Sequence, residues 1–222
     1  MTDIQLLTWA SPAFPIGAFA HSGGLEAAVA HAIVRDAASL ADWLAAQMEG
    51  GTIRTDALAV ARAVPASEPE LAELDALVLA LAGSPTRHAE LTALGRAFVE
   101  ATRAWWPDGW AGDGEIGDGE EARPRAYPVA FGALAGAHGL GGADAALAFV
   151  QAAAMNAVGA AQRLLPIGQS AAMRVMRDIE PAIETLARDA TTTGPDEWGT
   201  GTLATEIAAL AHPTLEPRLF RS

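Results

Sequence analysis

Neither cysteine nor lysine occurs among the 222 residues of this sequence. The absence of cysteine excludes disulfides, a cysteine nucleophile and any thiolate metal site. The absence of lysine excludes Schiff-base chemistry and the lysine of a phosphate-binding P-loop. All 14 basic residues are therefore arginines, and 27 acidic residues bring the formal net charge to −13. A nucleic-acid interface needs a basic stripe, so this charge argues against one and favours basic partners.

The sequence also lacks alternating runs of β-branched residues, and no stretch passes the period-2 test for a strand. Alanine, leucine and glutamate dominate the long segments, and these residues favour helix. We therefore predict an all-α, single-domain bundle of about eight to ten helices covering residues 1–222. The expected helices span 2–9, 24–33, 39–50, 55–64, 68–81, 86–106, 128–137, 144–165, 169–190 and 202–211.

Two details of these helices can be predicted from single residues. Ser67 and Glu70 form a capping box, with Pro69 inside the first turn, and should open the helix that ends at Leu81. Pro181 should kink or split the helix at 169–190, because proline removes a backbone donor.

Two segments fall outside the helical pattern. Residues 107–125 hold five glycines, two prolines and six acidic residues, which is typical of an acidic surface loop. The spacing of the acids does not match that of an EF-hand. Residues 213–222, here called the tail, are short and carry two prolines, so we expect a flexible tail.

Residues 145–162 are uncharged over 18 positions, which raises the question of a membrane span. The run is mostly alanine and includes Gln151, Asn156 and Gln162, so a buried central helix is favoured. The first residues show no basic region before an apolar stretch. We therefore expect a cytoplasmic protein without a membrane segment.

A search for catalytic and metal-binding motifs finds none. The five histidines include no pair at i, i+4 and no HExxH motif, and there is no GxSxG elbow. The glycines at 139–142 lie between expected helices and form a turn rather than a phosphate loop. We predict no catalytic, cofactor-binding or metal-binding residues. A helical enzyme with a site built from scattered acids and arginines, or a nickel-carrying protein, stays open as an alternative.

Two segments suggest binding instead. Residues 11–26 hold two prolines and the apolar residues Phe14, Ile16 and Phe19 in a stretch that cannot be one helix. Prolines stiffen a loop and so lower the entropy cost of presenting these side chains to a partner. The same residues could equally pack into the core. The tail ends in an apolar pair bracketed by arginines, Arg218 to Arg221, which suits an interface or a frayed end.

Together these segments resemble the urease accessory protein UreF family. Residues 11–26 read SPAFPIGAFAHSGGLE, close to a family motif, and residues 218–222 read RLFRS. Weaker matches are YPVAFG at 127–132 and AQRLLPIGQ at 161–169, where the family often has lysine in place of Arg163. The approach to the tail at His212 and Pro213 departs from the family pattern, and the acidic loop looks longer than usual.

The resemblance implies an all-helical scaffold with no enzymatic activity and no cofactor of its own. Such proteins bridge UreD (also called UreH) and the GTPase UreG, influence GTP hydrolysis, and help load nickel into apo-urease. Nickel and GTP are handled by the partners. The resemblance also implies a homodimer. A helical interaction module outside urease maturation is the main alternative.

The resemblance further implies partner-binding residues. Residues in the N-terminal segment would shape a partner-facing region, the tail would become ordered when UreD binds, and Arg163 would face the GTPase near the joint at 166–168. The full set is Phe14, Pro15, Gly17, Phe19, His21, Ser22, Glu26, Arg163, Gly168, Gln169, Arg218, Leu219, Phe220 and Arg221.

Overall fold

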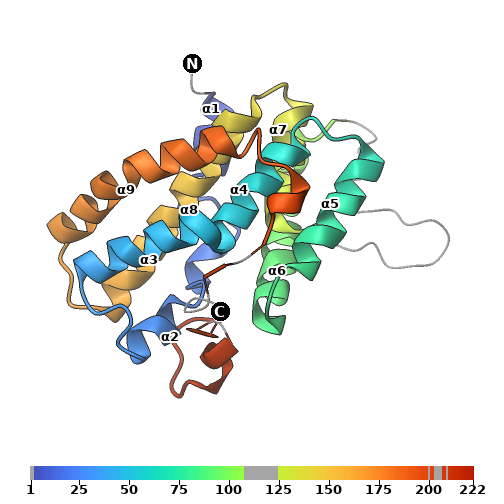
Figure 1. The fold of residues 1–222 in the computed structure, drawn as a ribbon. Helices are drawn as coiled ribbons and strands as arrows, with labels where there is room; N and C mark the ends of the chain where they lie inside the picture. Colours follow the sequence, from blue (N-terminus) through green and yellow to red (C-terminus); the bar gives the residue numbers. More distant parts are fainter. Residues whose placement is uncertain (1–2, 108–124, 200, 203–206, 209) are drawn as a thin grey trace.

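A computed structural model describes residues 3–107, 125–199, 201–202, 207–208 and 210–222 (Figure 1). These residues form nine α-helices and four short 3-10 helices and contain no strand, which confirms the all-α prediction. The α-helices are α1 Ile4–Trp9, α2 Leu25–Ala30, α3 Ala37–Gly50, α4 Thr52–Ala63, α5 Glu68–Ala80, α6 Pro85–Ala101, α7 Tyr127–Ala137, α8 Gly142–Leu164 and α9 Gln169–Asp189. The 3-10 helices are η1 Ala18–Ala20, η2 Arg103–Trp105, η3 Pro195–Glu197 and η4 His212–Thr214.

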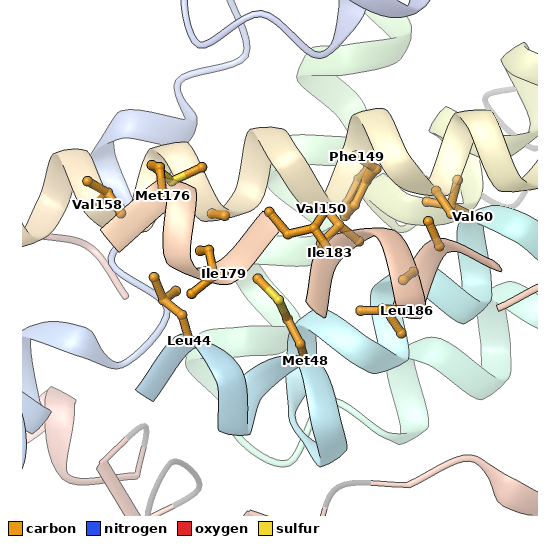
Figure 2. Close-up of a cluster of buried hydrophobic side chains, with 14 of the residues drawn as sticks. Leu44, Met48, Val60, Phe149, Val150, Val158, Met176, Ile179, Ile183 and Leu186 are labelled. Carbon is orange, nitrogen blue, oxygen red and sulfur yellow. The ribbon is translucent and has the colours of Figure 1, made fainter. Parts of the chain in front are cut away.

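Helix α8 is the centre of the bundle. It packs against α9, α4, α7, α2, α1 and α3. Figure 2 shows how α9 lies over α8 and α3, with Ile179, Ile183 and Leu186 pointing between them. These three residues recur at spacings of three and four and are almost fully buried, as expected for the apolar stripe of an amphipathic helix. Burial of such side chains stabilises the fold by about 1.5–3 kcal/mol each.

A second contact, between α4 and α7, depends on two glycines four residues apart. A Cβ on Gly132 would lie 2.3 Å from the Val60 carbonyl oxygen, and one on Gly136 would lie 2.1 Å from that of Val64. No side chain fits at these distances, so the two helices can approach this closely only because both positions are glycine. The sequence segment YPVAFG at 127–132 therefore has a packing role in α7.

The predicted helix start at residue 68 is confirmed. The Glu70 carboxylate accepts the backbone N–H of Ser67 at 2.7 Å, so the capping box opens α5 as expected. A second capping box, which sequence reasoning missed, opens α3: Asp36 accepts the backbone N–H of Ser39 at 2.8 Å. Gly51 separates α3 from α4, in agreement with the predicted break.

Two helix predictions are changed by the structure. Of the two effects predicted for Pro181, the split does not occur, because α9 runs unbroken from Gln169 to Asp189; the kink stays a prediction. Pro181 is exposed, so water can solvate the carbonyl freed four residues earlier, while Ile179 and Ile183 on the buried face hold the helix together. The helix expected at 86–106 ends at Ala101 and continues as η2, because the Thr102 hydroxyl bonds back to the Phe98 carbonyl at 2.6 Å.

Other predictions fall where the structure is not described. The acidic loop at 107–125 lies outside the described residues except at its two ends, and the helix expected at 202–211 lies only partly inside them. Helix α8 is the single helix of the described chain that is long and apolar enough to cross a membrane by length and composition. The core helix of a soluble bundle passes the same test, and α8 is the helix around which the others pack.

Candidate partner-binding site

The tail folds back onto the N-terminal segment, so the two segments singled out in the sequence lie side by side. The Ser22 backbone N–H donates to the backbone oxygen of Ser222 at 2.7 Å, and the Arg221 N–H donates to the Ala20 carbonyl at 2.8 Å. The Ser22 hydroxyl also donates to the backbone oxygen of Ser222, at 2.6 Å. The C-terminus accordingly ends beside α2 (Figure 1).

One carboxylate, that of Glu26 in the first turn of α2, organises the middle of the tail. Its Oε1 accepts the Leu219 N–H at 2.7 Å, and its Oε2 accepts the Phe220 N–H at 3.2 Å and the His212 Nε2 at 2.9 Å. Burial alone would raise the pKa of Glu26, but the hydrogen bonds from Leu219, His212 and Phe220 together lower it. The carboxylate is therefore ionised when it holds the tail.

The end of the tail is held by a chain of buried polar groups that begins at α6. The Ser222 hydroxyl donates to Glu90 Oε2 at 2.6 Å, and Glu90 Oε1 accepts from Arg87 at 2.7 Å. The other side of the Arg87 guanidinium donates to Asp56 on α4. This chain links the tail to two helices of the core.

His21 completes this end of the site. Its Nδ1 lies 2.7 Å from the Ser222 hydroxyl, which has only one hydrogen and donates it to Glu90, so Nδ1 carries the proton. Burial lowers the pKa of His21, and the nearby Arg221 and Arg87 lower it further against the opposing effect of Glu90. The imidazole is therefore neutral at pH 7.

The Phe220 side chain is the apolar anchor of the tail and is only 5% exposed. The Arg163 guanidinium lies over its ring, 4.3 Å from the centroid, and donates to the Phe19 carbonyl at 2.8 Å. Arg163 thus joins α8, the N-terminal segment and the tail. We call His21, Ser22, Glu26, Glu90 and Arg163 the tail seat.

The N-terminal residues divide between the core and the surface. Phe14 packs inward, with its ring 6.0 Å from that of Phe98, whereas Phe19 is 66% exposed. Pro15 is exposed, and Gly17 has φ +77°, a conformation that favours glycine and that turns the chain into η1. Phe14 therefore packs into the core, as one of the two alternatives predicted, whereas Phe19 lies at the surface and its role in binding a partner stays a prediction.

The predicted residues of the tail that remain, and those at the joint before α9, lie at the surface. Leu219, Arg218 and Arg221 are exposed, Leu219 at 70%. Gly168 precedes the first residue of α9, and Gln169 accepts a hydrogen bond from Gln162 at 3.2 Å. Gly168 and Gln169 are both exposed. The structure brings Arg163 together with the tail, rather than leaving it to project freely from the joint.

Five residues of this site escaped the sequence reasoning as site residues: Asp56, Arg87, Glu90, His212 and Ser222. Arg87 and Glu90 stand at i, i+3 after the Ser84 cap, which is ordinary for a surface ion pair, and only the fold reveals that Glu90 is buried and Arg87 half-buried. Burial raises the pKa of Asp56, and the Arg87 charge opposes this rise. His212 was noted only as a departure from the family pattern.

A cavity of about 130 Å³ lies beside the seat, between the N-terminal segment and helices α4, α6 and α8. Trp9, Phe14 and Phe149 line its apolar part, and Asp56 and Arg87 line its polar part. Among the described residues, no group of three or more histidine, aspartate or glutamate side chains is arranged to hold a metal ion.

Comparisons with known proteins agree with one another. The UreF family model matches residues 34–180, a range that includes neither the N-terminal segment nor the tail. The urease accessory protein UreF of Rhizobium etli strain CIAT 652 is 46% identical over 224 residues, covering 99% of this chain and 96% of that protein.

Two further relatives carry the same name. The UreF of Methylobacterium sp. strain 4-46 is 41% identical over 99% of this chain and 88% of its own length. That of Rhodopseudomonas palustris strain BisB5 is 40% identical over 98% of this chain and 90% of its own length. The relatives cover both the N-terminal segment and the tail, so with the match of the family model they show that this chain belongs to the UreF family of urease accessory proteins.

Proposed function

We propose that this chain is a non-catalytic, cytoplasmic scaffold of urease maturation that bridges a UreD (UreH) protein and the GTPase UreG. In this role it helps insert nickel into apo-urease and influences when GTP is hydrolysed, while nickel and GTP are bound by its partners. A homodimer is part of the proposal.

The observation that carries it is the surface made jointly by the tail and the N-terminal segment. Phe19 and Leu219 are large apolar side chains exposed at 66% and 70%, and the exposed Arg218 and Arg221 accompany them. Aromatic and arginine residues are enriched at interfaces. The chain as a whole has a net charge of −13, whereas this surface combines apolar side chains with arginines. Such a surface suits a partner with acidic groups.

The proposed partner contacts are tested by co-expression with candidate UreD and UreG proteins, followed by size-exclusion chromatography with mass measurement. We expect a complex that contains all three proteins. Removal of residues 218–222 should abolish capture of the UreD-like protein, and full binding without them would contradict the proposal. Purified chain alone should show no GTP hydrolysis above buffer.

Single substitutions sharpen the test. Phe19→Ala and Leu219→Ala remove exposed side chains and should each weaken binding of the UreD-like protein about 30-fold if they are hot spots. Leu147→Ala is the matched control, because Leu147 is also exposed but lies on α8 about 24 Å along the helix from Arg163. Equal effects of all three would show that the surface is not the binding site.

A further inference from the structure

The contacts of the tail are those of a peptide ligand in a receptor. Backbone hydrogen bonds fix its course at Ala20 and Ser22, the Glu26 carboxylate captures two successive N–H groups, and the Phe220 side chain is buried under Arg163. Peptide-recognition sites use this combination, in which the backbone contributes affinity and a pocket for one side chain gives specificity.

The selectivity of the seat can be read from its partners. The aromatic ring at residue 220 is needed for the contact with Arg163. A hydroxyl at residue 222 is needed because Ser222 both donates to Glu90 and accepts from His21. Leu219 contributes only its backbone to the seat, since its side chain is exposed. The recognised pattern therefore has Phe at position 220 and Ser at position 222, and any residue at positions 219 and 221.

The tail is joined to the body through a segment that is mostly exposed. His212 is buried and Leu215 packs against the core, whereas Pro213, Thr214, Glu216, Pro217 and Arg218 are exposed. Detachment of residues 219–222 takes Phe220 out of the core cluster and uncovers the seat, but it breaks no contact between the helices.

We propose that the tail seat is a peptide-binding site for Phe-x-Ser segments, and that the chain's own tail occupies it as a displaceable ligand. A partner that captures the exposed Arg218 and Leu219 would draw the tail away and leave the seat open for a second peptide of the same pattern. The seat would exist whether or not the chain serves urease maturation, because its contacts are all within one chain.

The tail competes with added peptide at a high effective concentration. A segment tethered by a short flexible linker is present at about millimolar concentration. A peptide added in solution must overcome this competition. Its apparent affinity for the intact chain is therefore reduced by about the ratio of the tail's effective concentration to the dissociation constant of the tail segment itself.

The test uses a fluorescein-labelled peptide of residues 213–222 and full-length chains in fluorescence polarisation. Phe220→Asp places a charge in the apolar pocket and prevents the tail of that chain from seating. We expect saturable binding to the Phe220→Asp chain and an apparent affinity about tenfold or more weaker for the wild-type chain, whose seat is occupied. Adding Glu26→Gln to Phe220→Asp should weaken binding about tenfold or more.

Changes in the peptide supply matched controls that leave the protein untouched. A peptide with Phe220→Ala should lose about tenfold or more in affinity, whereas Leu219→Ala should stay within about threefold because that side chain is exposed. Should Phe220→Asp fail to fold by circular dichroism, Ser222→Glu frees the tail from its other end by placing a carboxylate beside Glu90.

Three results would each overturn the proposal: no saturable binding to either folded variant, equal affinity for wild-type and variant chains, or equal affinity for the Phe220→Ala peptide. None of them would bear on whether UreD and UreG bind, which the chromatography above measures separately.

Discussion

Replacing Glu26 by glutamine should release the tail while leaving the rest of the fold in place. The amide keeps the size of the carboxylate but has one oxygen instead of two. If that oxygen faces Leu219, the NH₂ group faces the Phe220 N–H and His212; if it is turned round, the NH₂ group faces the Leu219 N–H. In either arrangement the glutamine NH₂ group faces another hydrogen-bond donor, so at least one backbone N–H of the tail loses its acceptor.

The expected magnitude follows from these lost contacts. A hydrogen bond to a charged group contributes about 1.5–3 kcal/mol, and a buried donor left without a partner costs about 1–3 kcal/mol. The loss cannot exceed the docking free energy of the tail, because the tail can detach and reach water. We therefore expect docking to weaken by about 2 kcal/mol, which corresponds to roughly 30-fold in the equilibrium constant for docking of the tail.

Amide hydrogen exchange is the appropriate measurement, because the effect is local. Exchange at Leu219, Phe220 and Arg221 should become about 30-fold faster in Glu26→Gln, while amides in the middle of α8 should keep their rates. Glu49→Gln, on the exposed side of α3, is the control and should change neither. Unchanged rates in the tail, or an equal acceleration in α8, would refute the assignment of Glu26 as the residue that holds the tail.

Other predictions concern pH, helix packing and the buried ion pairs. The tail supplies part of the cause that lowers the pKa of both Glu26 and His21: against the effect of burial, the Leu219 and Phe220 N–H groups lower that of Glu26, and burial and the Arg221 charge lower that of His21. Each group therefore binds protons more readily when the tail is undocked, so docking weakens as the pH falls. The loss should set in below the ordinary pKa of 6.5 for His21 and of 4.5 for Glu26, and it is measured as tail exchange corrected for the intrinsic rate. Gly132→Ala should lower the free energy of unfolding by about 1–3 kcal/mol, or Tm by about 2–12 °C, because the added methyl group meets α4. Gly159→Ala is the control: it lies in open space on α8 and should raise the free energy of unfolding by up to about 1 kcal/mol. Equal shifts of Tm in calorimetry would contradict the close contact of α4 and α7. Arg87→Met leaves the Asp56 and Glu90 carboxylates without their partner and should lower the free energy of unfolding, measured with urea, by about 3–5 kcal/mol. A decrease under about 1 kcal/mol would mean that water solvates these ion pairs.

Most of the fold could be predicted because helices leave local signals. The Ser67 and Glu70 capping box placed the start of α5, and the helix expected from residue 86 begins at Pro85 as α6. Pro181 shows the limit of local reasoning: of a kink and a split, the split does not occur, because the packing of Ile179 and Ile183 outweighed the missing backbone donor.

The site was predictable only in part, for a different reason. Glu26 and Leu219 are separated by 193 residues, and no periodicity relates positions so far apart. The N-terminal segment and the tail could each be recognised as unusual, but not as one site. Which of Phe14 and Phe19 faces the core depends on α6 and on the turn at Gly17, and composition carries no information on either.

The order of the elements along the chain has a consequence for folding. Every helix that builds the tail seat precedes the tail in sequence, and the closing contacts span about 130 to 200 residues. Contacts of such long sequence separation form late, after the local helices and their packing. A newly made molecule should therefore pass through a stage in which the bundle is folded and residues 213–222 are still free, and a partner that meets the protein at that stage has no docked tail to displace.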